Sequence, residues 1–135
     1  NYGTAGMHYK TLGSSGSTRS GTDVKKSWFM FDDEVVAVGS GISSTTGNYV
    51  ETIIDNRRLN KNGSNEVLIN GEALDIRDDG TESAAKGTKV AEASCIYLEG
   101  NTADSQIGYY FPGHADIMAL KEKRSGNWNT QGTTE

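Results

Sequence analysis

The chain has 135 residues, of which 34% are hydrophobic, and a formal net charge of -5. This length is enough for one domain with a core of its own, and we expect residues 1–135 to form a single domain. The acidic balance excludes a strong basic field for nucleic acid. No run of about 18 apolar residues is present, so we expect no membrane partner either.

The cysteine and glycine content excludes some kinds of site and predicts many turns. Cys95 is the only cysteine, which excludes an internal disulfide and a zinc site built from several thiolates. Its run, EASCIYLEG, favours a buried and inert thiol. Seventeen glycines against one proline predict many turns. The start of the chain, NYGTAGMHYK, has neither a leader peptide nor an initiator methionine, so we expect a piece of a longer or processed protein.

In chain order, the first predicted strand is AGMHYKTL, followed by a Gly/Ser-rich loop over residues 13–23. In KSWFMF, Trp28 and Met30 alternate with Phe29 and Phe31, a pattern typical of a strand buried between two layers at the centre of the core. The strand VVAVG follows after only three residues, which predicts a tight hairpin.

The rest of the chain predicts further strands separated by turns. Asn70-Gly71 is typical of a two-residue hairpin turn. A helix over DIMALKEKRSG is the alternative to the last strand, and strand is preferred because its neighbours are all β. The predicted fold is an all-β antiparallel sandwich of eight or nine strands with no helix. The later strands are YVETIID, NEVLING, EALDIRD, KVAEASCIYLEG, SQIGYYFPG and DIMALKEKRSGNW.

Three consecutive acids, Asp32, Asp33 and Glu34, could contribute to a calcium site or merely form a turn. Calcium takes six to eight oxygen ligands, and three adjacent residues point in different directions, so we interpret them as a solvated hairpin tip. Whether a cation binds there stays open. A carboxylate pair for glycoside hydrolysis would need two acids from separate strands, and the sequence does not identify such a pair.

Other candidate sites are weak. His8 and His114 are the only histidines, no G-x-S-x-G motif accompanies them, and His114 follows FPG in an expected loop, so both are interpreted as structural or exposed. Glycine-rich residues 39–47 lack the Lys-Ser/Thr of a phosphate-binding loop. The aromatic residues are assigned mostly to the core, with Trp128 the best candidate for exposure on a sugar-stacking surface; they are Trp28, Tyr97, Tyr109, Tyr110, Phe111 and Trp128. We assign no catalytic, cofactor-binding or metal-binding residue and expect no cofactor.

The runs KKSWFMFDDEVVAVGSGISS and VETIIDNRRLN closely resemble the central β-domain of polysaccharide lyase family 8, the family of hyaluronate, chondroitin AC and xanthan lyases. YGTAGMHYK, QIGYYFPG and KEKRSGNWN are similar to flanking parts of that domain. The resemblance covers most of the chain and is weakest over residues 75–90.

This resemblance implies a segment of a larger β-sandwich in a secreted bacterial enzyme that cleaves hyaluronan or a related uronic-acid polysaccharide by β-elimination. It implies that the catalytic Asn, His, Tyr and Arg lie in an α/α-toroid absent from this chain, and none of them transfers to a position here. The implied partners are the polysaccharide, the toroid and the remaining β-domains. The segment alone is expected to be inactive.

Two alternatives remain open. A non-catalytic carbohydrate-binding or structural β-sandwich would bind glycosaminoglycan by itself and lose affinity on Trp128→Ala. A free-standing lyase or hydrolase would depend on His8 or His114.

Overall fold

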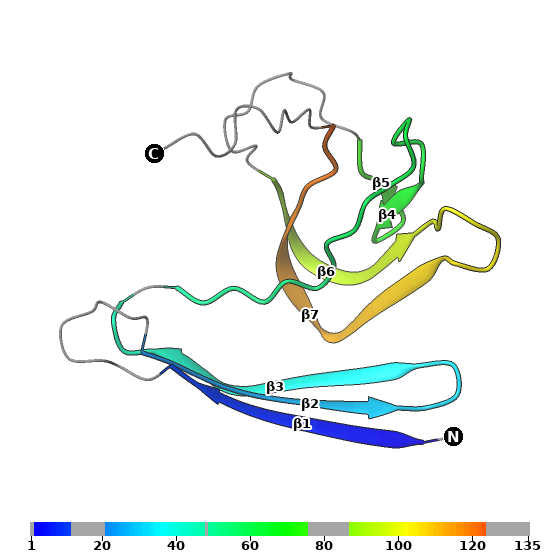
Figure 1. The fold of residues 1–135 in the computed structure, drawn as a ribbon. Helices are drawn as coiled ribbons and strands as arrows, with labels where there is room; N and C mark the ends of the chain where they lie inside the picture. Colours follow the sequence, from blue (N-terminus) through cyan, green and yellow to red (C-terminus); the bar gives the residue numbers. More distant parts are fainter. Residues whose placement is uncertain (1, 12–20, 48, 76–86, 124–135) are drawn as a thin grey trace, which may run out of the picture. The chain divides into compact units, whose positions relative to one another are not determined.

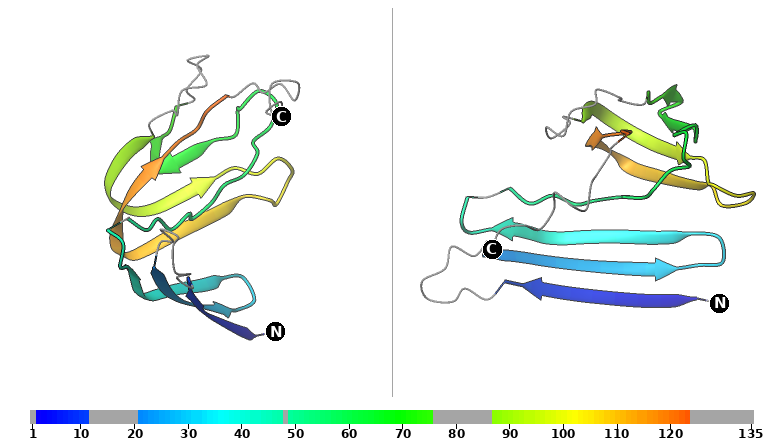
Figure 2. Two further views of the ribbon diagram at one scale, coloured as in Figure 1. Left: turned by 60° about the vertical axis from the view of Figure 1, so that its left-hand side comes forward. Right: turned by 45° about the horizontal axis from the view of Figure 1, so that its top comes forward.

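The computed structural model describes residues 2–11, 21–47, 49–75 and 87–123. Those residues form seven strands in two antiparallel sheets, with no helix among them (Figures 1 and 2). The all-β fold class is confirmed, and the part of the chain that the structure describes forms seven strands rather than the predicted eight or nine. The chain divides into two compact units, Asn1–Asn56 and Arg57–Glu135, and each holds one sheet.

The first unit contains sheet 1, with the strand order β1-β2-β3. The strands are β1 (Gly3–Lys10), β2 (Thr22–Met30) and β3 (Val35–Ser44). They pair in sequence order as a meander, and they run side by side as a long ribbon in Figure 1. A backbone bond from Phe31 N to Glu34 O, 2.8 Å long, closes the β2–β3 hairpin.

Both faces of sheet 1 are apolar toward the β2–β3 hairpin. In the register, Ala5, Trp28 and Ala37 share one face, while Phe29 and Val36 share the other, so the predicted alternation is confirmed. The prediction that this strand is the centre of the core is wrong for this chain. Phe29, Met30 and Phe31 are each about two-fifths exposed, because the three strands of the first unit form a single layer.

Glycine-rich residues 39–47 belong mostly to β3 rather than to a loop. The pairing of Asp23 with Ser43 and of Lys25 with Ser40 leaves one extra residue on β3. Gly41 lies at this bulge with a φ of 58°, the left-handed conformation that favours glycine. The glycine pattern here therefore serves a β-bulge.

The second unit contains sheet 2, with the strand order β5-β4-β6-β7. The hairpin predicted at Asn70-Gly71 is confirmed: both residues have positive φ, 53° and 85°, as the type I′ turn requires. The bounds are β4 (Val67–Ile69), β5 (Glu72–Ala73), β6 (Thr88–Leu98) and β7 (Ile107–Ala119).

Several predicted strand boundaries were wrong. SQIGYYFPG and the start of DIMALKEKRSGNW form the single strand β7, because Pro112 and Gly113 lie in a bulge that needs no ladder bonds. YVETIID forms no strand: its backbone pairs with no strand among the described residues, and Ile53 is 72% exposed. Beyond β5, residues 76–78 of EALDIRD lie outside the described residues, as do residues 13–20 of the first loop.

Sheet 2 buries one of its faces. Ile69 and Leu98, which point to the same side in the register, are 5% and 7% exposed, and Ala93 is fully buried. Residues 57–65 contribute to this unit through Asn65, whose side chain is 2% exposed. The Asn65 carboxamide accepts from Asn60 N and donates to Glu99 O and Gly100 O.

Candidate functional site

The first polar cluster lies on neighbouring strands of sheet 1, at the end away from the β2–β3 hairpin. Asp23 Oδ1 lies 2.8 Å from His8 Nε2, and Asp23 Oδ2 lies 3.1 Å from Lys10 Nζ. The register explains the contact, since Lys10 is directly opposite Asp23 and His8 is its diagonal neighbour. Hydrogen bonds from His8 and then from Lys10 hold the pKa of the Asp23 carboxyl below its ordinary value of 3.8.

This cluster is at the surface. The side chains of His8 and Lys10 are 53% and 68% exposed, and that of Asp23 is 28% exposed. The interpretation of His8 as an exposed or structural residue is consistent with this geometry. The arrangement pairs the Asp23 carboxylate with its two neighbours and offers no activated nucleophile.

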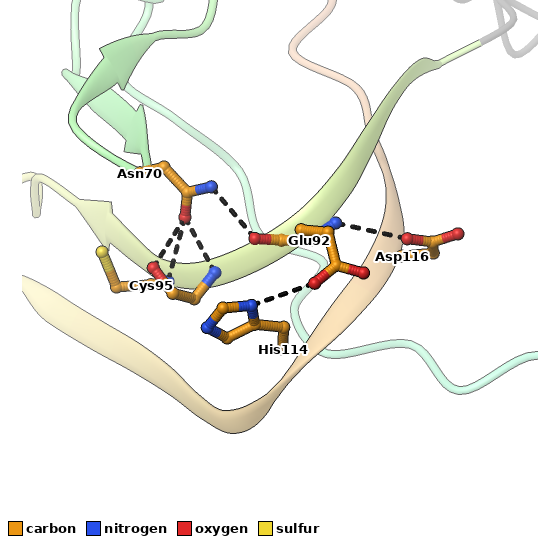
Figure 3. A network of polar contacts seen from close by, with 6 residues as sticks. Asn70, Glu92, Cys95, His114 and Asp116 are labelled. Atoms are coloured by element: carbon orange, nitrogen blue, oxygen red, sulfur yellow. Dashed lines mark hydrogen bonds and ion pairs between the residues drawn. The ribbon is translucent and has the colours of Figure 1, made fainter.

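The second polar cluster is built around Asn70 at the tip of the β4–β5 hairpin (Figure 3). Its Oδ1 accepts from Ser94 N, Ser94 Oγ and Cys95 N at 2.8, 3.0 and 3.3 Å. Its Nδ2 donates to Glu92 O at 3.2 Å, and its backbone N donates to Cys95 O. Asn70 therefore satisfies backbone groups of β6 that lie beyond the last β4–β6 pair, Ile69 and Ile96.

His114 lies beside this cluster, in a bulge of β7. Between the pairs Cys95–Tyr110 and Ala93–Ala115, Ser94 on β6 faces residues 111–114 on β7. Glu92 and His114 both have positive φ, 55° and 58°, and His114 Nδ1 lies 3.0 Å from Glu92 Oε2 (Figure 3). The expectation that His114 lies in a loop is therefore wrong.

Asp116 and Lys89 complete the surroundings of Glu92. Asp116 Oδ1 accepts from Glu92 N at 3.2 Å, and Asp116 Oδ2 lies 3.7 Å from Lys89 Nζ. The side chains of His114 and Glu92 are 53% and 78% exposed. These are solvated contacts, which hold the bulge in place more than they create a reactive environment.

The second cluster does not form a nucleophilic triad. A histidine beside a carboxylate is the orienting half of such a triad, but the Ser94 hydroxyl donates to Asn70 and not to His114. The Cys95 thiol is exposed, so its predicted burial is wrong. Sequence reasoning used Asn70 only as a turn residue. Its side-chain role had no sequence signal, because the β6 backbone groups that it contacts lie more than 20 residues away.

The acids Asp32, Asp33 and Glu34 lie at the tip of the β2–β3 hairpin, as predicted. Among the described residues, no group of three or more His, Cys, Asp or Glu side chains is arranged to hold a metal ion. The described part of the chain also contains no helix long and apolar enough to cross a membrane.

The predicted burial of the aromatic residues is partly wrong. Tyr110 and Tyr97 are 75% and 37% exposed, because they lie on the face of sheet 2 opposite Ile69 and Leu98. Trp28, Tyr109 and Phe111 are half-buried, and Trp128 lies outside the described residues. The Tyr109 hydroxyl accepts a 3.2 Å hydrogen bond from Arg57.

Comparisons with known proteins agree on one family. The family described as polysaccharide lyase family 8, super-sandwich domain, matches residues 1–135. A xanthan lyase of Bacillus sp. (strain GL1) is 50% identical over 109 residues, covering 77% of this chain and 11% of that protein. A hyaluronate lyase of Thermasporomyces composti is 38% identical over 104 residues, covering 77% of this chain and 12% of that protein.

A solved structure supports the same assignment at the level of the fold. Paenibacillus xanthan lyase superimposes with a TM-score of 0.76 and 44% sequence identity, over 95% of this chain and 11% of that one. The chain thus spans about a tenth of the length of these relatives.

Proposed function

Since the chain belongs to polysaccharide lyase family 8, within its super-sandwich domain, we propose that it is a β-sandwich segment of a polysaccharide lyase. The enzyme would cleave hyaluronan or a related uronic-acid polysaccharide by β-elimination. The observation that carries this proposal is the family match over all 135 residues, together with relatives named xanthan lyase, hyaluronate lyase and chondroitinase. The organisms of these relatives support a bacterial parent enzyme. The proposal also includes secretion, which the family resemblance implies.

We propose that the catalytic residues of the parent enzyme lie outside residues 1–135. β-Elimination needs a group that neutralises the uronate and an acid/base that moves the C5 proton. His8 and His114 lie in different units, each beside a carboxylate at an exposed position. Among the residues that the structure describes, neither histidine contacts a nucleophile. In the proposal, the catalytic residues belong to an α/α-toroid of the parent enzyme and not to residues 1–135.

The exposed faces of sheet 1 support the proposal that the segment is part of a larger sandwich. Strands that are apolar on both faces are typical of an inner layer, and large exposed apolar patches mark surfaces that bind other protein parts. Val36 and Val38 are 44% and 49% exposed, and Val35 is 61% exposed. In the proposal, residues 1–135 belong to one β-sandwich domain, and other strands of the parent cover these faces.

The direct test is an ultraviolet assay for the conjugated, unsaturated uronide that β-elimination produces. The full-length protein is incubated separately with xanthan, hyaluronan and chondroitin, beside the 135-residue chain alone. We expect product with the full-length protein on at least one polymer and none with the segment. Product from the segment, abolished by His8→Ala or His114→Ala, would overturn the placement of the chemistry. Absence of product with the full-length protein on every polymer would overturn the lyase assignment.

A further inference from the structure

One end of sheet 1 carries two lysines and a histidine on a single face, with one carboxylate. The four residues, here called the cationic patch, are His8, Lys10, Lys25 and Asp23. Lys25 lies directly opposite His8 in the β1–β2 register, just as Lys10 lies opposite Asp23. Residues directly opposite each other in antiparallel strands project to the same face, so all four side chains share one surface. This end of the face is polar, whereas Phe29 and Val36 occupy the other end.

The cationic patch has two lysine ammonium groups, and its single carboxylate contacts only one of them. Asp23 uses Oδ1 for His8 and Oδ2 for Lys10. Among the described residues, no carboxylate or other acceptor is bound to the exposed Lys25 ammonium group. The lysine faces Ser40 on β3, a neutral hydroxyl residue that can add a hydrogen bond but no compensating charge.

This local excess contrasts with the rest of the chain, which has 18 acidic against 13 basic residues. The exposed Lys25 ammonium group provides three donors and a positive charge for an anionic ligand, and the neighbouring Ser40 hydroxyl can donate one more hydrogen bond. Asp23 keeps His8 and Lys10 in place, which reduces the side-chain entropy lost when a ligand binds.

We propose that the cationic patch binds a carboxylate of a uronic-acid polysaccharide, with Lys25 as its main contact and His8 beside it. This inference rests on the proposed function, because it takes the ligand class from the proposed substrate. The contact positions the polymer on the β-domain, away from the bond that is cleaved. It therefore contributes to binding and not to the chemical step.

The test compares Lys25→Gln with Lys61→Gln in the full-length protein. Lys61 is another exposed lysine, located in the loop before β4, and it serves as the matched control for loss of one surface charge. We expect Lys25→Gln to raise KM about two- to five-fold at low salt, as for one exposed charge contact, with kcat unchanged. The increase should vanish at high salt, and Lys25→Arg should restore most of the wild-type KM. Equal KM values for Lys25→Gln and Lys61→Gln would overturn the proposal that the cationic patch binds the polysaccharide.

A binding experiment separates failure of the patch from failure of the lyase assignment. The full-length protein is titrated with hyaluronan oligosaccharides and with the same oligosaccharides after reduction of their carboxyl groups, while the affinity and the NMR signals of His8 and Lys25 are followed. Binding only of the acidic form, weakened by Lys25→Gln, supports the patch even if no polysaccharide is cleaved. Equal binding of both forms, or no change at these signals, would overturn it.

Discussion

Sheet 1 and sheet 2 show two different ways in which this chain builds a β-structure. Sheet 1 is a three-stranded meander with one bulge, and most of its large apolar side chains are exposed. Sheet 2 is more irregular, because it combines the very short strands β4 and β5 with the long, bulged strands β6 and β7, yet it buries Ile69, Ala93 and Leu98. Two asparagines, Asn65 and Asn70, hold its loops and its bulge by side-chain bonds to the backbone.

The two sheets show that regular strand pairing and burial of apolar side chains are separate sources of stability. Ladder hydrogen bonds form wherever strands align, but hydrophobic stabilisation requires that a second layer remove the face from water. Sheet 1 has regular ladder pairing but little burial. Sheet 2 has ladder pairing and also buries one of its faces. We therefore expect point substitutions to have larger effects in sheet 2, with one electrostatic effect measurable in sheet 1.

The largest effect is expected from Asn65→Asp. The side-chain Nδ2 donates to Glu99 O, Gly100 O and Asn101 Oδ1, all at 3.2 Å or less, in a site where Asn65 is 2% exposed. A carboxylate would be buried against these acceptors, which should cost roughly 3 to 5 kcal/mol of the free energy of unfolding. Chemical denaturation measures the loss, and hydrogen exchange should increase in β4, β6 and β7 while β1–β3 stay unchanged.

The matched control is the same chemical change at Asn70. There only one bond, Nδ2 to Glu92 O, is lost at an exposed position, and the three donors to Oδ1 retain their acceptor. Asn70→Asp should therefore cost less than about 1 kcal/mol. Equal losses for the two variants would show that the burial of Asn65 does not control the stability of this unit.

A smaller effect is expected from truncating an apolar side chain, and it should differ between the two sheets. Ile69 in β4 is 5% exposed, so Ile69→Ala should cost about 2 to 3 kcal/mol, the low end for a buried side chain in a small core. Val38 in β3 is 49% exposed, so Val38→Ala should cost well under 1 kcal/mol in the 135-residue chain. Unfolding of both variants in urea checks the contrast. A large loss for Val38→Ala would mean that a second layer covers sheet 1 in solution.

The smallest effect concerns Asp23 in sheet 1. Because bonds from His8 and then Lys10 lower its pKa, the ionised form stabilises the folded chain above the ordinary value of 3.8. This contribution should be lost as the pH falls through the lower pKa of the folded state. An NMR titration of the Asp23 carboxyl should give a midpoint below 3.8, and His8→Ala should raise that midpoint. A midpoint unaffected by His8→Ala would mean that the His8–Asp23 contact does not persist in solution.

Local sequence patterns predicted the positions of the turns well, but they predicted less well which side chains are buried or in contact. Asn70-Gly71 and the short loop at Asp32 and Asp33 were predicted correctly, because positive φ and tight turns depend on residues adjacent in the chain. The strand expected over YVETIID was wrong, since alternation indicates which residues could form a strand but not whether a partner strand is available. His114 was expected in a loop because Pro-Gly before it is typical of turns, whereas a bulge accommodates the same residues within β7.

By itself, the sequence determined the all-β class, the two tight hairpin turns and the resemblance to polysaccharide lyase family 8, because these depend on local conformational preferences and on runs of residues. Only the tertiary structure decided which apolar faces are covered and which polar side chains meet. The contacts of Asn70 with Ser94 and of His8 with Asp23 join residues 24 and 15 positions apart. Such contacts arise from strand register and bulges, which depend on how distant segments pair and are not encoded in any single short stretch.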